Sequence, residues 1–312
     1  MRMLNKNFWP GFWLTLATAV TGVAQAAIYP LPPADVDIIG ELRSVEVQPD
    51  ETLLDIGRRH GVGYEEMQRA NPGVDMWVPE PGTTVVVPTR HILPSVPREG
   101  LVLNVAEMRL YYYPPAKAGE PRTVETYPVS IGRMDWRTPI GKTSVVAKQK
   151  NPSWYPPQSV KLEAKAEGRE VPSVVPPGPD NPLGTRVLRL GMPAYLIHGT
   201  NNPWGIGMRV THGCVRMYPE DIENLFERVS VNTPVRIVNE PVKVGWFAGS
   251  LYLEAHPVLE EHREDEAQIL RQAVERIVQI LGNHGHRVDL ARIKETINDQ
   301  AGLPTSISRS SI

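Results

Sequence analysis

Short runs of alternating apolar and polar residues, separated by turn-forming residues, occupy the middle of the chain between residues 98 and 239. Many short strands with frequent turns favour a β-sandwich or barrel-like domain and a mainly β fold. The 31 prolines among 312 residues agree with that interpretation, because proline marks turns and linkers. We expect strands within 101–114, 124–131, 143–148, 187–190, 194–197 and 235–238, the last closing the domain, and one clear helix at 219–229.

Two smaller units flank this domain. After a leader at 28–44, residues 45–90 follow the order strand, helix, helix, strand, with the helices near 53–57 and 64–70. Residues 240–312 are expected to form a helical extension packed against the β domain. Its apolar spacing predicts a charged amphipathic helix at 258–282 and a shorter one around Leu290, Ile293 and Ile297.

The segment 151–185 lacks any strand or helix periodicity and is rich in Pro and Gly, with aromatic residues at Trp154 and Tyr155. Irregular segments of this length are usually either functional or disordered. We expect it to cover one end of the β domain, with a floppy insertion as the alternative.

Residues 1–26 have the parts of a secretory signal peptide. Arg2 and Lys6 give a positive start, a mostly apolar run follows, and Ala24-Gln25-Ala26 matches a cleavage site. An uncleaved anchor is the alternative, although the apolar run is short for a membrane span. The net charge of −2 gives no sign of nucleic acid binding. We therefore expect an exported protein, most simply a periplasmic one.

The chain has a single cysteine, Cys214. Exported proteins usually pair their cysteines, so a lone thiol needs either burial or chemistry to explain it. His198 lies 16 residues earlier, after an apolar run, and the Asn-, Pro- and Gly-rich loop between them can bring the two together. An imidazole beside a thiol can take its proton and later return it to a leaving amine.

Each neighbouring residue has both a chemical and a structural explanation. Gly199 and Gly213 would let the backbone approach a reacting carbonyl and form an oxyanion hole, and Arg216 can hold a carboxylate in a bidentate way. Alternatively, Cys214 is a packed thiol, His198 a satisfied histidine at a strand end, and Arg216 half of a salt bridge. Their combination around one exported cysteine favours catalysis.

This arrangement resembles the signature of the L,D-transpeptidase (YkuD-type) catalytic domain. That signature is a His-Gly pair, a gap, then Ser/Thr-His-Gly-Cys, an aliphatic residue and Arg or Asn. His198-Gly199 and Thr211-His212-Gly213-Cys214-Val215-Arg216 match every position, and the stretch SIGRMDWRTPIGKTSV at 130–145 is also typical. The resemblance extends over about 98–239. The order of domains is similar to that of periplasmic members from Gram-negative bacteria.

The resemblance implies a role for each matched residue. Cys214 would be the nucleophile and His198 the general base and acid. His212 and Gly213 would shape the turn and the oxyanion hole. Arg216 would order the site or contact substrate. Thr211 and Gly199 would be supporting residues.

The family's donor is a peptidoglycan stem tetrapeptide. The resemblance implies that the cysteine forms a thioester with this peptide, that the terminal D-alanine leaves, and that the acyl group is transferred to an amine. It implies no metal or cofactor. The amine would belong to a second stem peptide, giving a 3→3 cross-link, or to the terminal lysine of an outer-membrane lipoprotein. Carbapenem-type β-lactams acylate this cysteine in the family.

Other functions stay open at this point. Water could resolve the thioester, making the protein an L,D-carboxypeptidase or an amidase, or the chain could be a non-catalytic peptidoglycan-binding protein. A papain-like protease disagrees with the order, because in that family the cysteine precedes a distant histidine.

Two further features concern binding. Residues 45–90 resemble a LysM domain, carried by PDETLLDIGRRHGV, MQRANPGV and GTTVVVP, which implies binding of N-acetylglucosamine-containing glycans. A module that packs on its neighbour and binds no glycan is the alternative. His284-Gly285-His286 gives only a weak metal signal, and we expect a solvated turn without metal.

Overall fold

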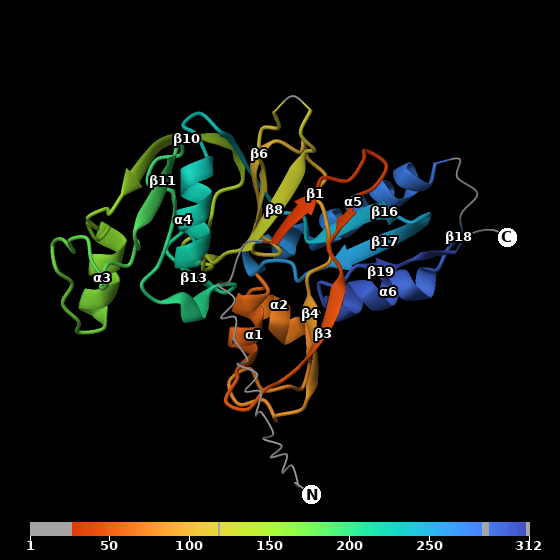
Figure 1. Ribbon diagram of the computed structural model, residues 1–312, viewed down its shortest axis with the longest axis horizontal. Helices are drawn as coiled ribbons and strands as arrows, with labels where there is room; N and C mark the ends of the chain where they lie inside the picture. The colour runs from red at the N-terminus through yellow and green to blue at the C-terminus, as the bar shows by residue number, and fades with distance from the viewer. Residues whose placement is uncertain (1–26, 118, 283–286, 310–312) are drawn as a thin grey trace, which may run out of the picture.

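A nine-stranded sheet forms the centre of the computed structural model, which describes residues 27–117, 119–282 and 287–309 (Figure 1). Neighbouring strands are antiparallel except for two parallel pairs, β6–β15 and β12–β14. In spatial order the strands are β1 (Ala27–Pro30), β8 (Thr123–Pro128), β7 (Arg109–Tyr113), β6 (Gly100–Asn104), β15 (Pro234–Val238), β10 (Gly141–Lys150), β11 (Arg186–Leu190), β12 (Leu196–His198) and β14 (Val215–Arg216).

The strands expected between 98 and 239 are present, with two differences. The run at 124–131 is divided, because β8 ends at Pro128 and β9 (Ile131–Gly132) pairs instead with β13 (Arg209–Thr211). β15 does not close the sheet; it lies between β6 and β10. Part of the expected leader also belongs to the sheet, since β1 adds to the edge of β8.

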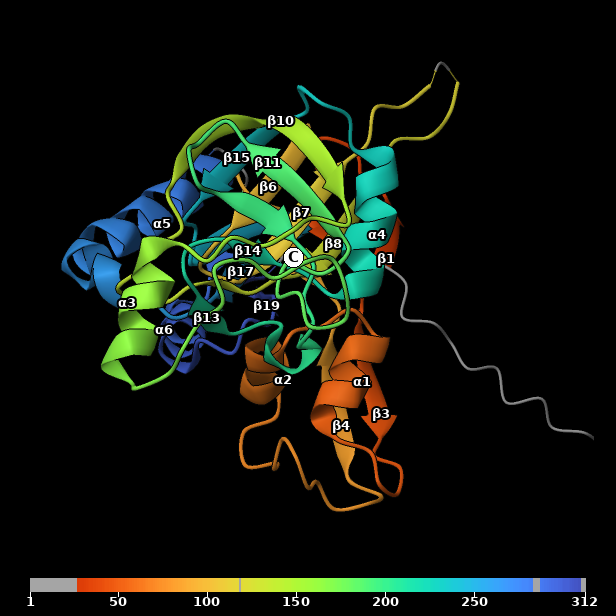
Figure 2. The ribbon, with the colours of Figure 1, turned by 90° about the vertical axis from the view of Figure 1, so that its left-hand side faces the viewer.

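The expected helix is α4 (Pro219–Arg228), which packs alongside β11 (Figure 2). Its proline at the first position, acidic residues in the first turn and arginine in the last turn are all favourable to a helix. Ile222, Leu225 and Phe226 are buried in the main core with the apolar side chains of the sheet. α4 follows β14 directly, so this packing also fixes the chain just after Cys214.

The N-terminal module, which we define as Leu42–Pro88, has the expected order of elements: β3 (Leu42–Glu46), α1 (Leu53–Arg59), α2 (Tyr64–Ala70) and β4 (Thr84–Pro88). Thr52 and Asp55 form a capping box that starts α1. The module has its own apolar core. Just before and just after the module, β2 (Ile38–Ile39) pairs with β5 (His91–Ile92), and this pairing brings the two ends of the module together.

The C-terminal extension differs from the helical prediction. It contains α5 (Glu266–Leu281), preceded by the 3-10 turn η2 (Glu260–Asp265), and α6 (Leu290–Asp299), but also a three-stranded sheet. The three-stranded sheet consists of β16 (Val242–Phe247), β17 (Ser250–Ala255) and β19 (Thr305–Ser306). A separate pair of short strands, β18 (Arg287–Val288) and β20 (Ser308–Arg309), completes the extension.

The physical reason lies in the hairpin turn between β16 and β17. Ala248 and Gly249 both have positive φ, which suits a two-residue hairpin, but alanine gives little warning of such a turn. The sequence pattern predicted that α5 and α6 pack against the β domain. Their apolar faces pack instead on this three-stranded sheet.

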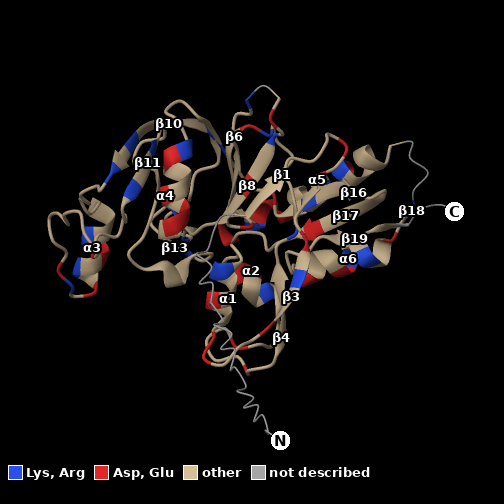
Figure 3. Cartoon of the chain, viewed as in Figure 1, with Lys and Arg blue, Asp and Glu red and all other residues tan. Residues whose placement is uncertain are grey.

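Charged residues of both signs are spread over the molecule (Figure 3). Among the described residues, no helix has the length and apolarity needed for a membrane span. Residues 1–26, expected to be a signal peptide, and His284 and His286 lie outside the described residues.

Candidate active site

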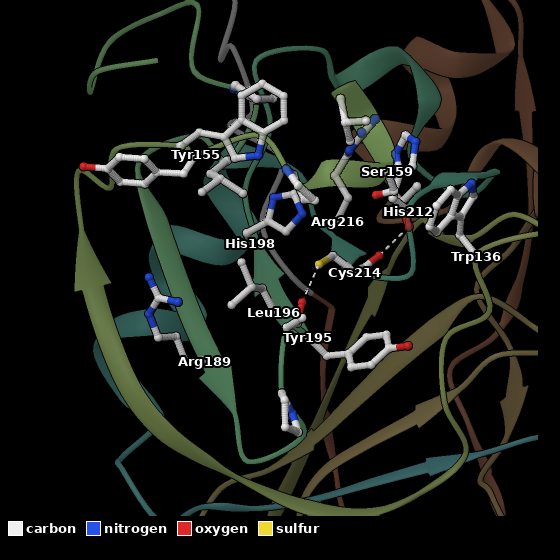
Figure 4. A pocket seen from close by; sticks show the side chains of 18 of the residues that line it. Trp136, Tyr155, Ser159, Arg189, Tyr195, Leu196, His198, His212, Cys214 and Arg216 are labelled. Atoms are coloured by element: carbon white, nitrogen blue, oxygen red, sulfur yellow. Dashed lines mark hydrogen bonds between the residues drawn. The ribbon is translucent and has the colours of Figure 1, made fainter. Parts of the chain in front are cut away.

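Parallel pairing of β12 with β14 brings the two ends of the His198–Cys214 loop together. Ile197 pairs with Val215, and His198 pairs with Arg216. His198 and Cys214 therefore line the same cavity, of about 540 Å³, and both side chains point into it (Figure 4). The spacing in the sequence predicted this return of the loop.

His198 is buried, and its hydrogen bond fixes the position of its proton. Its Nδ1 lies 2.6 Å from the carbonyl oxygen of Gly199. A carbonyl can only accept, so Nδ1 donates and Nε2 of the neutral ring keeps its lone pair. Burial, helped by the positive charge of Arg216, lowers the pKa of His198 to about 4. At neutral pH the ring is an uncharged base.

The thiol of Cys214 is also kept neutral. It is partly buried, and its sulfur lies 3.6 Å from the carbonyl oxygen of Ala194. Burial raises the pKa of the thiol, against smaller opposing effects of a backbone hydrogen bond from Leu196 and of Arg216. A thiol in this state is a weak nucleophile until a base removes its proton.

The turn before Cys214 depends on Gly213. Its φ of +98° is a conformation that other residues avoid, and a methyl group there would come within 2.9 Å of the Tyr195 ring. Thr211 Oγ1 donates to the carbonyl of Cys214 at 2.6 Å, and Thr138 Oγ1 donates to that of Gly213 at 2.9 Å. These bonds hold the turn from both sides.

Arg216 presents an uncompensated positive charge to the cavity. It lines the cavity, its Nε is buried without a hydrogen-bond partner among the described residues, and burial lowers its pKa. Of the described residues that line the cavity, none is acidic, whereas Arg189 is a second cation. A partly buried cation that finds no counter-ion among the described residues suits a site that receives an anionic ligand.

Comparison with known proteins identifies the family of the chain. Residues 98–237 match the family model of the L,D-transpeptidase catalytic domain (YkuD). Over 308 residues, the chain is 38% identical to the protein named "Probable L,D-transpeptidase YcfS" of Escherichia coli K12, covering 95% of each chain. The chain belongs to the L,D-transpeptidase family.

Two further relatives cover this L,D-transpeptidase over nearly its whole length. It is 40% identical over 307 residues to "Probable L,D-transpeptidase ErfK/SrfK" of Salmonella typhimurium, with 96% of each chain covered. It is 38% identical over 301 residues to "Probable L,D-transpeptidase YbiS" of Escherichia coli K12, with 94% of this chain and 96% of that one covered. The similarity therefore includes the N-terminal module and the C-terminal extension as well as the catalytic domain.

The segment 151–185 of the transpeptidase is an ordered cover of the cavity and contains a helix, α3 (Gln158–Ala166), that the sequence pattern did not predict. The buried side-chain amide of Asn181 holds it together by donating to the carbonyls of Pro152, Val175 and Pro176. Eight of its residues line the cavity: Ser153, Trp154, Tyr155, Pro157, Ser159, Val160, Pro182 and Leu183.

A contact between α3 and the turn before Cys214 was missed from the sequence. Glu163 of α3 accepts a hydrogen bond from His212 Nε2 at 2.6 Å and pairs with Arg133, and these two partners lower the pKa of Glu163. The ring of Trp136 lies 5.2 Å from that of His212. Arg133 and Trp136 stand in the stretch that resembles the family, but nothing local connects Glu163 to a residue 49 positions later.

One cluster elsewhere in the transpeptidase has the composition of a metal site. Ligand atoms of His91, Glu107 and Glu254 lie within 4.8 Å of one another, and all three residues are buried. The ammonium group of Lys243 already lies between the carboxylates, 2.6 Å from Glu107 and 2.8 Å from Glu254. Lysine therefore supplies the positive charge that a metal would supply.

Proposed function

We propose that the protein is a cysteine-dependent peptidoglycan L,D-transpeptidase of cell wall biogenesis, with Cys214 as nucleophile and His198 as general base and acid. The observation that carries the proposal is the shared cavity, which holds a protonated thiol, a neutral imidazole with a free Nε2, and an unpaired arginine. These are the groups that acyl transfer from an acidic peptide requires.

Acylation would begin with transfer of the Cys214 proton to His198 Nε2. The sulfur then attacks the carbonyl carbon of the third residue of a stem tetrapeptide, and the carbonyl oxygen becomes an oxyanion. Backbone N–H groups of the turn formed by His212, Gly213 and Cys214 would stabilise that oxyanion. Collapse breaks the bond to the terminal D-alanine, whose nitrogen receives the proton from His198, and leaves a thioester.

Deacylation would run the same proton path in reverse. An acceptor amine attacks the thioester, His198 takes a proton from the amine, and the Cys214 thiolate leaves and is protonated again. The amine belongs to a second stem peptide or to the terminal lysine of a lipoprotein. No residue of this path requires a metal or a cofactor.

Arg216 would hold a carboxylate of the donor. The donor peptide carries free carboxylates, and one of them would give the guanidinium the partner that it lacks. Arg216 would also keep His198 neutral, because its charge helps to lower the pKa of that ring.

We also propose an export signal in residues 1–26, a periplasmic location, and glycan binding by the N-terminal module. The order of strands and helices in Leu42–Pro88 supports the LysM-like interpretation. Exposed Trp77, whose ring lies 6.5 Å from that of Tyr64, gives the module an apolar surface on which a sugar ring could stack.

The test is intact-protein mass spectrometry after mixing the mature protein with a disaccharide tetrapeptide, with and without an acceptor amine. An acyl adduct on Cys214 that moves to a second stem peptide supports the cross-linking enzyme. Transfer only to a lysine-ended lipoprotein peptide supports anchoring, and transfer only to water supports a carboxypeptidase or amidase. Folded protein with a free thiol and no adduct would contradict the catalytic proposal and favour a peptidoglycan-binding protein.

A further inference from the structure

The N-terminal module is docked on the loop that connects His198 with Cys214. The first two amide groups of α2, those of Tyr64 and Glu65, donate to the carbonyls of Ile206 and Gly207 at 3.0 and 3.2 Å. The first amides of a helix have no partner within the helix, so this loop supplies the acceptors that α2 lacks. Figure 2 shows α2 just below β13, which continues from the same loop.

Two glycines let the backbones meet at this contact. A methyl group on Gly63 would lie 2.8 Å from Cα of Gly207, and one on Gly207 would lie 2.3 Å from the amide nitrogen of Tyr64. Contacts this short are not tolerated, so either side chain would force the module away from the loop. Gly63 has an ordinary φ of −82°, so space and not backbone conformation is what requires glycine there.

Ion pairs tie the module to the catalytic domain on either side of that contact. Arg58 makes a bidentate pair with Glu220 at 2.8 and 2.9 Å, and its guanidinium lies 5.1 Å from the centre of the Tyr218 ring. Glu66 makes a bidentate pair with Arg109 at 2.8 and 2.7 Å, and the Arg109 side chain is only 1% exposed. Paired geometry at partly or fully buried sites makes these contacts more rigid than ordinary surface ion pairs.

The docked positions bracket the nucleophile in the sequence. Gly207 precedes Cys214 by seven residues, and Glu220, in the first turn of α4, follows it by six. The docked loop is held by Ser130, whose Oγ donates to the carbonyl of Gly205 at 2.5 Å. The loop continues into β13, which pairs with β9. Thr211, at the end of β13, donates to the carbonyl of Cys214. A short series of hydrogen bonds thus leads from the module to the turn that holds the thiol.

We propose that the N-terminal module has a second role besides any glycan binding: it positions the thiol of Cys214 against His198, with Gly63 and Arg58 as positioning residues. A module that only tethered the enzyme to a glycan would need no contact with this loop. Because proton transfer depends on the distance between thiol and imidazole, displacement of the loop should slow acylation without weakening the binding of a small donor.

The test compares Gly63→Ala and Arg58→Ala, singly and together, in the full mature protein. The donor is a soluble disaccharide tetrapeptide, and three quantities are measured: kcat and KM, the pH profile of Cys214 alkylation by iodoacetamide, and hydrogen exchange of the Tyr64 and Glu65 amides. We expect the double variant to lose amide protection, to lose about tenfold in kcat with little change in KM, and to show a shifted alkylation profile. Arg59→Ala is the matched control, because Arg59 pairs with Glu51 inside the module.

Fast exchange of the two amides with kcat and alkylation as in the wild type would overturn the proposal. So would continued protection in the double variant, or an equal loss of kcat in Arg59→Ala, since the effect would then be a general loss of module stability. Alkylation needs no peptide substrate and Cys214 is the only cysteine. The positioning role can therefore be judged even if the wild-type protein transfers no acyl group.

Discussion

Burial keeps both partners of the Cys214–His198 pair uncharged, and this decides which kind of cysteine enzyme the site can be. The pKa of the thiol is raised and that of the imidazole is lowered, so a preformed thiolate–imidazolium pair is not favoured in the free protein. In the proposed acylation the proton would move as the sulfur attacks, with His198 as the general base. A protonated thiol is also oxidised more slowly than a thiolate.

The pH dependence of acylation follows from these shifts. A histidine whose pKa is lowered to about 4 remains a neutral base well below its ordinary pKa of 6.5 and is lost as a base only when pH falls through 4. We therefore expect the single-turnover acylation rate to stay nearly constant from neutral pH down to about pH 5 and to halve near pH 4. Quenched-flow mass spectrometry measures this rate. A half-loss near pH 6.5 would show that His198 is not the base, or that its ring is more hydrated than the structure indicates.

Replacing Cys214 separates a chemical role of the thiol from a role in packing. Cys214→Ala should abolish the acyl adduct, while the free energy of unfolding changes by no more than about 1 kcal/mol. The reason is that the sulfur faces the cavity and its polar contacts are weak, a 3.6 Å approach to the Ala194 carbonyl and a backbone hydrogen bond from Leu196. Mass spectrometry and urea unfolding of the same variant give the two quantities. A large loss of stability would instead favour a packed thiol with an architectural role.

At the scale of elements, what could be predicted from the sequence was what local pattern determines. The alternating runs identified β11 and β12 beside the site but not the short strands β13 and β14, and the loop between His198 and Cys214 brings the two residues together as its composition predicted. α3 was missed although QSVKLEAKA is rich in helix-forming residues, because the Pro and Gly residues on both sides of it dominated the pattern; its contact with His212 could not be foreseen, since it joins residues 49 positions apart. The β16–β17 hairpin was missed for a different reason, since its turn places Ala248 at a positive φ that alanine seldom adopts.

The contact of Glu163 makes a prediction about the cover. Glu163→Gln keeps the size of the side chain but removes its negative charge. The pair with Arg133 and the hydrogen bond from His212 should both weaken, so α3 should be held less firmly over the cavity. Because the pair is partly exposed, we expect a rise in KM of about threefold for the tetrapeptide, and faster amide exchange in 158–166. Glu167→Gln is the control, since Glu167 pairs only locally with Arg169. Equal behaviour of the two variants would show that Glu163 does not hold the cover.

At the scale of the whole molecule, one buried lysine connects three parts of the chain. Lys243 lies in β16 of the C-terminal extension and donates to the carbonyl of Ile92, which follows the N-terminal module. It also pairs with Glu107 between β6 and β7 and with Glu254 in β17, and all three side chains are fully buried. Burial raises the pKa of Glu107 despite this pairing, whereas Lys243 and His256 outweigh burial and lower the pKa of Glu254. The segment that follows the module, the turn between β6 and β7 of the catalytic sheet, and the extension therefore meet around one charge.

Lys243→Met should destabilise the protein by about 3–5 kcal/mol near neutral pH, because it removes the ammonium group that pairs with both buried carboxylates. Glu254 keeps its contact with His256 at 2.7 Å, and Glu107 keeps hydrogen bonds from Asn104 and Tyr111, but neither replaces the lost charge between the two carboxylates. Each would bind a proton more tightly in the folded than in the unfolded state, so the loss should be smallest near pH 5 and grow as pH rises. Urea unfolding at pH 5 and pH 8 measures both effects. Lys150→Met is the matched control: its pair with Glu227 is more than half exposed, so it should cost at most about 1 kcal/mol at either pH. If the two variants were equally stable, or if the loss in Lys243→Met did not grow with pH, the buried lysine would not be what holds the three parts together.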